Sequence, residues 1–349
     1  MGSYPMNVSQ ISLFLMNLPL SYLFFFLTLI SGTLLSISSS SWFGAWIGLE
    51  LNLISFIPLI TIKINSYFSE AAIKYFLIQA LASAFIIISR CLYMSFTLLS
   101  SALISVALLL KLGAAPCHFW FPQVIQGLSW IQVIILISIQ KLAPIFLISY
   151  LMTSPALVQI IILSAILSAF IGAVGGLNLI RLRKIIAFSS INHISWILIS
   201  ISLNDIIWIL YFSLYVVISS SVIGLFHSLQ ASNIPDLLNS NHLTSILTLV
   251  VPLRLLSLGG LPPFTGFVPK WIVIQIIVIN KIFIPLFFLL LSALITLYFY
   301  LRILIPYILL LNPVLTFHTK SPASYSTLFI PLIFFNSLGI LTPAAFTLL

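Results

Sequence analysis

Three lysines lie within or beside long apolar stretches of this sequence, where a charged side chain is costly. Lys111 is near the middle of one stretch, Lys141 is in the middle of another, and Lys270 follows a run of glycines and prolines. Gly113 and Pro116, which break helices, come directly after Lys111. A charge at the centre of a membrane span costs roughly 2.5–3.5 kcal/mol on insertion scales, so it marks a functional site by default. We interpret a lysine beside a broken apolar helix as part of an ion path.

Glu50 is the acidic residue best placed to act with these lysines. It sits in the middle of the apolar stretch GAWIGLELNLISF. Burying an unpaired carboxylate is costly, so we expect a cationic partner, either Lys111 or Lys141. A change in the separation of Glu50 and Lys111 would load or unload a proton. The alternatives are a carboxylate that only hydrogen-bonds a neighbouring helix, and lysines that extend to a helix end. The central positions of the lysines argue against the second alternative.

His193 is the strongest candidate among the remaining titratable residues. It lies mid-span in SSINHISW, where it could relay protons, although a histidine held only for structure is almost as well supported. Glu70 and Lys74 are spaced i,i+4 at a helix start, which favours an ion pair at the membrane interface. The others give weaker signals: His118 and His227 could line water, Asp205 and Asp236 fall in loops, and Arg254 is buried by its position in the sequence without an assigned role.

The composition excludes a soluble protein. The chain has 349 residues, of which 62% are hydrophobic and 5% charged, with a mean hydropathy of +1.28, as in polytopic membrane proteins. The formal net charge of +9 comes from cations spread singly, so nucleic-acid binding is excluded. Cys91 and Cys117 have no metal-ligand spacing, and we expect neither a disulfide nor a metal site. No catalytic triad order, phosphate-binding glycine loop, haem pair or iron–sulfur cysteine set is present.

Apolar length predicts an all-α fold with about eleven transmembrane spans, which form one transmembrane domain over residues 1–349. The predicted spans are Leu20–Ile37, Trp42–Ile62, Ala71–Phe96, Leu98–Ala115, Leu128–Leu151, Ala156–Leu179, Ile185–Leu203, Ile206–Leu229, Leu243–Asn280, Ile282–Leu301 and Ser326–Leu348.

Two of these spans are predicted to be broken, near residues 111–118 and near residues 257–270. Leu112-Gly113-x-x-Pro116 recurs as Leu258-Gly259-x-x-Pro262. Interrupted spans in corresponding halves are typical of transporters built from internal repeats, with sites near the membrane midplane.

Loop charges predict the orientation. If each broken span crosses once, one side holds most of the loop cations, namely Lys63, Arg181, Arg183, Lys184 and Lys320, with Arg302 near a helix end. Arg90 and Lys281 lie on the other side. The positive-inside rule then places the N-terminus inside and the C-terminus outside.

Six sequence blocks carry a family resemblance: GLELNLISFIPL, EAAIKYFLIQALAS, KLGAAPCHFWFPQVIQG, QKLAPI, GGLNLIRLRKIIAFSSINHISW and LSLGGLPPFTGFVPKW. In this order they resemble the antiporter-like subunits in the membrane arm of the mitochondrial NADH–ubiquinone oxidoreductase, respiratory complex I. The resemblance implies two inverted five-helix repeats, proton pumping driven by quinone reduction in other subunits, and a place in the mitochondrial inner membrane with the N-terminus in the matrix. It also implies FMN and iron–sulfur clusters on other subunits and none on this chain, with the other membrane-arm and accessory subunits as partners.

The resemblance also implies roles for individual residues. By motif, Glu50 matches a glutamate paired with the first broken-helix lysine, Lys111, and Lys141 matches a central connecting lysine. Lys270 matches the second broken-helix lysine, on the exit side, and His193 matches a histidine between the last two lysines. The sequence departs from the pattern at Gln123, where an acid is usual, at Cys117, where an aromatic or apolar residue is usual, and at Arg254.

Two other classes of protein remain as alternatives. A stand-alone secondary cation/proton antiporter would use the same residues, and migration with a large NADH-oxidising particle on a native gel would argue against it. A purely structural subunit would keep its proton-to-electron ratio when the lysines are neutralised. Four intramembrane charged residues argue against a pure scaffold.

Overall fold

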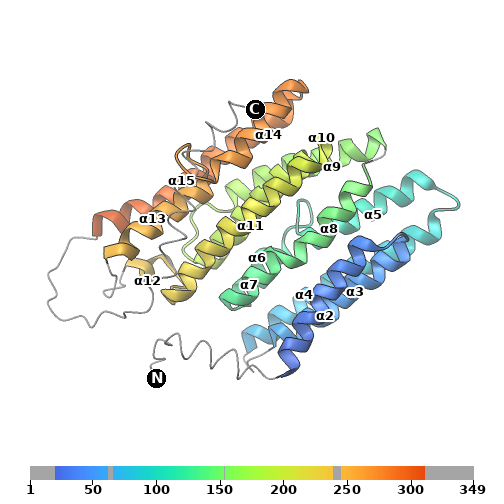
Figure 1. Ribbon diagram of the computed structural model, residues 1–349, viewed down its shortest axis with the longest axis horizontal. Helices are drawn as coiled ribbons and strands as arrows, with labels where there is room; N and C mark the ends of the chain where they lie inside the picture. Colours follow the sequence, from blue (N-terminus) through green and yellow to red (C-terminus); the bar gives the residue numbers. More distant parts are fainter. Residues whose placement is uncertain (1–19, 62–65, 153, 239–244, 311–349) are drawn as a thin grey trace.

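The structure is a computed structural model that describes residues 20–61, 66–152, 154–238 and 245–310. Within these ranges the regular elements are helices, and Figure 1 shows the long ones running side by side. They are α2 (Leu20–Ser38), α3 (Trp42–Ile60), α4 (Ser66–Leu92), α5 (Thr97–Leu112), α6 (Trp120–Gly127), α7 (Trp130–Ile137), α8 (Ile139–Tyr150), α9 (Pro155–Val174), α10 (Leu182–Leu203), α11 (Asp205–Ser228), α12 (Ile234–Leu238), α13 (Ser245–Gly259), α14 (Phe267–Ile279) and α15 (Phe283–Leu310).

The all-α membrane fold expected from composition is confirmed. Eight helical segments in the described ranges are long and apolar enough to cross a membrane, and shorter apolar helices accompany them. Each predicted span up to Leu301 coincides with a helix or a pair of helices. The predicted span Ser326–Leu348 and the loop cations Lys63 and Lys320 lie outside the described residues.

Both predicted breaks are present. The first follows α5, where Gly113 takes the left-handed conformation (φ 71°) that glycine adopts without strain. The indole Nε1 of Trp120 donates to the carbonyl of Leu110 at 3.0 Å, so one carbonyl freed by the break has a partner. The second break separates α13 from α14, and Gly260 has φ 78°. At both breaks the glycine with positive φ follows the last turn of a helix, so the backbone changes direction there.

The described crossings fall into two successive sets of five. The first set is α2, α3, α4, the pair α5–α6 and the pair α7–α8; the second is α9, α10, α11, the pair α13–α14 and α15. The crossing broken by glycine and proline is the fourth in each set. Because five is odd, the second set starts from the opposite side of the membrane and its broken crossing runs in the opposite direction. This is the arrangement of an inverted repeat.

Close packing in this fold depends on small residues at helix contacts. A Cβ atom at Gly48 of α3 would lie 2.7 Å from the carbonyl oxygen of Gly32 in α2, so both glycines are needed for these helices to approach. Gly172 allows the same approach of α9 to the backbone of Asn192 in α10. The middle of α10 is buried on all sides, from Ser189 to Ile201. This helix is the centre of the second repeat.

One break was not predicted. The span Leu128–Leu151 is a single apolar run in the sequence, but the structure divides it at Ser138 into α7 and α8. The hydroxyl of Ser138 donates to the carbonyl of Ile134 at 2.7 Å, a side-chain bond that competes with regular helix geometry. Pro144 also removes a backbone donor one turn into α8. Lys141 therefore lies just after an irregular turn.

Candidate functional site

All three predicted lysines are buried: the exposed fractions are 7% for Lys111, 3% for Lys141 and 5% for Lys270. Lys111 is in the last turn of α5, directly before the first break. Lys141 is in the first turn of α8, and Lys270 is in the first turn of α14, directly after the second break. Each ammonium group therefore lies beside an interruption of a helix, where backbone carbonyls are freed for polar contacts.

Glu50 lies within electrostatic range of Lys111. It occupies the middle of α3 and is half-buried, and its charge acts on both Lys111 and Tyr75. Within the described ranges, the only ion pair shorter than 4.0 Å joins Glu70 to Lys74, so Glu50 and Lys111 are not in direct contact. Glu50 and Lys111 therefore interact through space and not through a direct ion pair in this structure. A separation of this kind is compatible with a pair whose distance changes.

A small cavity connects Lys111 with Lys141. Its volume is about 10 Å³, and its polar lining comes from these two lysines, Gln79 and Gln140. That volume is near the lower limit for one water molecule, and the lining supplies polar partners for it. The hydroxyl of Tyr75, which also lines this cavity, donates to Oε1 of Gln140 at 3.1 Å and so holds the Gln140 side chain in the cavity wall. This cavity is the polar space between the two lysines.

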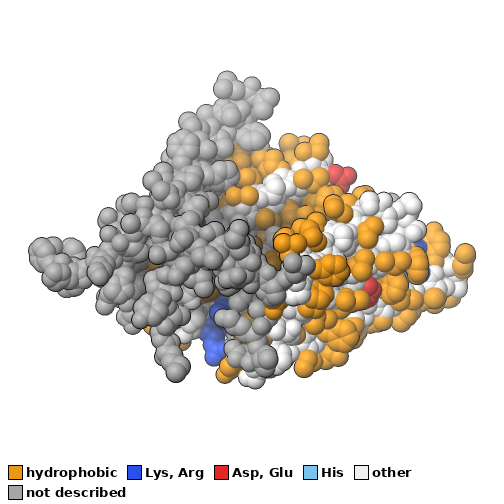
Figure 2. All heavy atoms as spheres, turned by 60° about the horizontal axis from the view of Figure 1, so that its bottom comes forward, with side chains coloured by type: hydrophobic (Ala, Val, Ile, Leu, Met, Phe, Trp, Pro, Cys, Tyr) orange, Lys and Arg blue, Asp and Glu red, His pale blue; other side chains and the backbone are white. Residues whose placement is uncertain are grey.

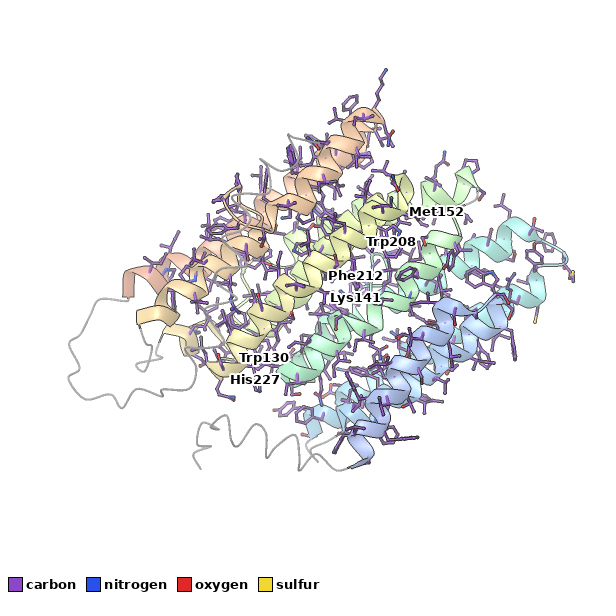
Figure 3. The ribbon with its side chains drawn as sticks, viewed as in Figure 1. Trp130, Lys141, Met152, Trp208, Phe212 and His227 are labelled. Atoms are coloured by element: carbon purple, nitrogen blue, oxygen red, sulfur yellow. The ribbon has the colours of Figure 1, made fainter. Side chains whose placement is uncertain are left out.

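Lys141 is enclosed by aromatic rings. Its Nζ lies 4.5 Å from the centre of the Phe121 ring and 5.9 Å from that of Tyr215, and it has no hydrogen-bond partner among the described residues. Figure 3 shows Lys141 midway along the line where α7–α8 and α11 run side by side, with Trp130 and His227 toward one end of that line. A ring face attracts a cation without accepting its proton. The charge is therefore held in place while its protons remain available.

His193 lies between Lys141 and Lys270. The charges of both lysines act on it, and it is buried. Its Nδ1 is 3.0 Å from the hydroxyl of Tyr211, and its ring centre is 4.7 Å from that of Tyr215. A second cavity of about 10 Å³ joins His193 to Ser257 and Gly266 at the second break.

Lys270 is held by the second break. Its Nζ donates to the carbonyl of Gly259 at 2.9 Å and lies 6.0 Å from the Trp196 ring centre. Gly260 makes this possible, since a Cβ atom there would be 2.9 Å from both Cδ and Nζ of Lys270. The carbonyl at the end of α13 therefore serves as the acceptor for this ammonium group.

The structure brings the five predicted site residues into one row across the two repeats, in the order Glu50, Lys111, Lys141, His193 and Lys270. Carboxylate, ammonium and imidazole groups can each gain and release a proton. A cavity of about one-water size lies between Lys111 and Lys141. The Tyr215 ring lies 5.9 Å from Nζ of Lys141 and 4.7 Å from the His193 ring. The fold therefore places titratable side chains from both halves of the chain near one another.

The other predicted residues lie outside this row. Glu70 and Lys74 form the expected exposed i,i+4 ion pair. Asp205 and Asp236 are exposed as expected, but they lie in the first turns of α11 and α12, not in loops. Asp236 accepts from the backbone amides of Ser232 and Asn233, whereas Asp205 accepts from the indole of Trp208. Arg254 is buried, and its Nη1 donates to the carbonyl of Ser221 at 2.6 Å, which ties α13 to α11.

Sequence reasoning missed the aromatic and amide groups that separate the charged ones. The signal was present: Tyr211 and Tyr215 are one helical turn apart on α11, and Trp196 is one turn after His193 on α10. Gln140 adjoins Lys141 in the chain. Spacing alone did not show that these faces meet.

These features define a class: a multi-pass, transporter-like membrane protein with two inverted repeats and a buried row of titratable groups. The family model for the transmembrane part of NADH:quinone oxidoreductase/Mrp antiporter proteins matches residues 39–99 and 92–296. The chain therefore belongs to the NADH:quinone oxidoreductase/Mrp antiporter family.

Comparisons with individual proteins agree. The NADH-ubiquinone oxidoreductase chain 2 of Anopheles gambiae is 46% identical over 292 residues, 80% of this chain and 83% of that one. The protein of the same name from Locusta migratoria is 35% identical over 335 residues, 94% of this chain and 97% of that one. Among solved structures, respiratory complex I from Thermus thermophilus with bound Aureothin contains a chain with a TM-score of 0.79 and 23% identity, covering 93% of this chain and 79% of that chain. The last comparison supports the fold.

Proposed function

We propose that this chain is a core membrane subunit of a proton-pumping NADH:ubiquinone oxidoreductase, and that Glu50, Lys111, Lys141, His193 and Lys270 carry its protons. The observation that supports this most directly is the row of three buried lysines with His193 between the last two. The names of the curated relatives supply the coupled reaction, quinone reduction by NADH, which other subunits perform.

In this proposal the chain holds no redox centre and converts a distant event into proton movement. A change in the Glu50–Lys111 separation alters how strongly Lys111 retains its proton. The proton passes through the cavity to Lys141, then past Tyr215 to His193 and Lys270. Lys270 releases it on the exit side. Flavin and iron–sulfur clusters belong to other subunits, and membrane-arm and accessory subunits are the partners.

We also propose the mitochondrial inner membrane as the location, with the N-terminus in the matrix and the C-terminus toward the intermembrane space. Arg181, Arg183 and Lys184 start α10 at one end of the bundle. Arg302 joins them there, because its Nη1 is 3.3 Å from Oδ1 of Asn178 in the preceding loop. Arg90 and Lys281 are at the other end. The positive-inside rule favours this orientation.

The test replaces each lysine of the row by methionine in the intact complex, reconstituted into vesicles. Methionine keeps the length of the side chain and removes the titratable group. Lys281→Met is the matched control, since Lys281 is exposed in the turn between α14 and α15. We expect the proton-to-electron ratio to fall for Lys111→Met, Lys141→Met and Lys270→Met and to stay unchanged for the control.

A native gel stained for NADH oxidation establishes first that each variant is assembled. An assembled Lys111→Met complex with an unchanged ratio would contradict the proposed proton path. Migration of the wild-type chain apart from any NADH-oxidising particle, together with cation flux in vesicles, would instead support the stand-alone antiporter.

A further inference from the structure

A cavity of the described chain that lies apart from the proposed proton row is lined by cationic groups. Its volume is about 550 Å³, and its polar lining includes Lys74, Arg181, Arg183, Glu70 and Gln126. It is formed by the start of α4, the end of α6 and the start of α10, which meet at one end of the bundle. This volume is in the range of ligand pockets.

The lining has an uncompensated positive charge. Glu70 is the single acidic side chain in it, and Lys74 already pairs with it. The two arginines form no ion pair within the described ranges. The Nε of Arg183 is buried without a hydrogen-bond partner, while its Nη1 donates to the carbonyl of Gln126 at 3.3 Å. The site therefore offers donors and charge to an anion.

The fold positions the side chain of Arg183 and the backbone of Arg181. The Arg183 guanidinium lies 5.1 Å from the centre of the Trp130 ring. The backbone at Arg181 forms an antiparallel bridge with Asn233, and the amide of Ile234 donates to the carbonyl of Ile180 at 3.1 Å. The wall is thus organised before any ligand binds, which reduces the entropy lost on binding.

A track for an acyl chain leads away from this cavity. Along α4, the side chains of Ile73, Leu77 and Leu81 are spaced i,i+4 and all are exposed. They form an apolar stripe that starts at the residue before Lys74, which lines the cavity, and runs along the helix away from the cavity. Figure 2 shows hydrophobic side chains spread over the visible described surface, with Lys and Arg side chains in only a few small places.

We propose that this cavity binds the headgroup of an anionic phospholipid, with its phosphate on Arg181 and Arg183 and an acyl chain along the stripe Ile73–Leu77–Leu81. Basic pockets between membrane helices near an interface bind such headgroups because the phosphate accepts charged hydrogen bonds in a partly desolvated site. A free phosphate ion would use the same arginines but would leave the stripe unused. The proposal stands independently of the proton path.

The experiment uses the intact complex in nanodiscs of phosphatidylcholine with a trace of a phosphatidylglycerol analogue that carries a photoreactive group on its acyl chain. After irradiation, labelled peptides are mapped by mass spectrometry. We expect labelling of the α4 segment around Leu77 and Leu81, at least fivefold above that given by the phosphatidylcholine analogue with the same photoreactive chain. Equal labelling by the phosphatidylglycerol and phosphatidylcholine analogues in the wild-type complex would overturn the proposal.

Variants then test the headgroup contact. Arg181→Gln and Arg183→Gln together should reduce α4 labelling by the anionic lipid at least fivefold. Arg302→Gln is the matched control, because Arg302 is an exposed cation at the same end of the bundle with Asn178 as its partner. Labelling that survives the double change would show that the two arginines do not hold the headgroup and would overturn the proposal. Phosphate-dependent protection of the arginines without any labelling of α4 by the anionic lipid would show that the site takes free phosphate instead.

Discussion

Gly260 and Gly259 provide a paired test of how Lys270 is positioned. Gly260 has φ 78°, and a Cβ atom there would lie 2.9 Å from Cδ and Nζ and 3.1 Å from Cε of Lys270. A Cβ atom at Gly259 would contact only Cδ2 of Tyr300, at an ordinary 3.6 Å. Gly260→Ala should therefore displace the ammonium group, whereas Gly259→Ala should leave it in place.

Two terms set the size of the effect. A left-handed conformation costs an L-residue such as alanine about 1–2 kcal/mol. Displacing Lys270 breaks its 2.9 Å bond to the Gly259 carbonyl, and a hydrogen bond from a charged donor contributes about 1.5–3 kcal/mol. The second term corresponds to a loss of roughly tenfold to a hundredfold in the occupancy of the present ammonium position. Gly259→Ala incurs neither term.

The assay is the proton-to-electron ratio of the complex in sealed vesicles, with assembly checked on a native gel. We expect an assembled Gly260→Ala complex to oxidise NADH with a lowered ratio, and Gly259→Ala to match the wild type. An unchanged ratio in Gly260→Ala would refute the argument that the position of Lys270 matters. Equal losses in both variants would point to general damage to the second break instead.

Three further predictions concern contacts around the row and at its edges. Tyr211→Phe removes the hydroxyl 3.0 Å from Nδ1 of His193, a bond of about 1 kcal/mol, and should slow pumping about fivefold in an assembled complex. Gln132→Ala removes the side-chain amide whose Nε2 donates to the carbonyls of Leu59 and Ile60, the last two residues of α3, at 2.7 and 3.2 Å. The free energy of unfolding should fall by about 1–3 kcal/mol, and the thermal unfolding temperature should fall with it. At Asp236, the Ser232 hydroxyl and nearby backbone amides lower the carboxyl pKa, so this cap is complete above about pH 4 and is lost as the pH falls through the lowered pKa. The protection of the Ser232 amide against hydrogen exchange, relative to the intrinsic rate at the same pH, should fall there.

Each of these predictions has a clear contrary result. A Tyr211→Phe complex that pumps at the wild-type rate would remove the hydroxyl from the path. A Gln132→Ala complex with an unchanged unfolding temperature would show that the two hydrogen bonds from Gln132 to α3 do not stabilise the fold. Acid-independent exchange at Ser232, or unchanged exchange in Asp236→Asn at neutral pH, would contradict the proposed cap.

Local sequence determined the membrane-spanning elements and the two breaks. Apolar length predicts a span because a bilayer requires about 20 apolar residues, and the helices α2, α3 and α11 begin and end within two residues of the predicted bounds. Gly113 and Gly260 predict breaks because glycine tolerates backbone conformations that other residues avoid. The unpredicted break at Ser138 has no comparable signal, since its hydroxyl bond to Ile134 forms within an otherwise apolar run.

The charged residues of the row were also identified in the sequence, since burying them is costly and few others exist. What the tertiary structure alone decided is their order in space and the groups between them. The aromatic enclosure of Lys141 combines Phe121 of α6 with Tyr215 of α11, and the cavity beside it combines Gln79 of α4 with Gln140 of α8. Residues this far apart in the chain meet only because the helices pack side by side, and helix packing depends on the matched shapes of two surfaces rather than on the pattern of either one.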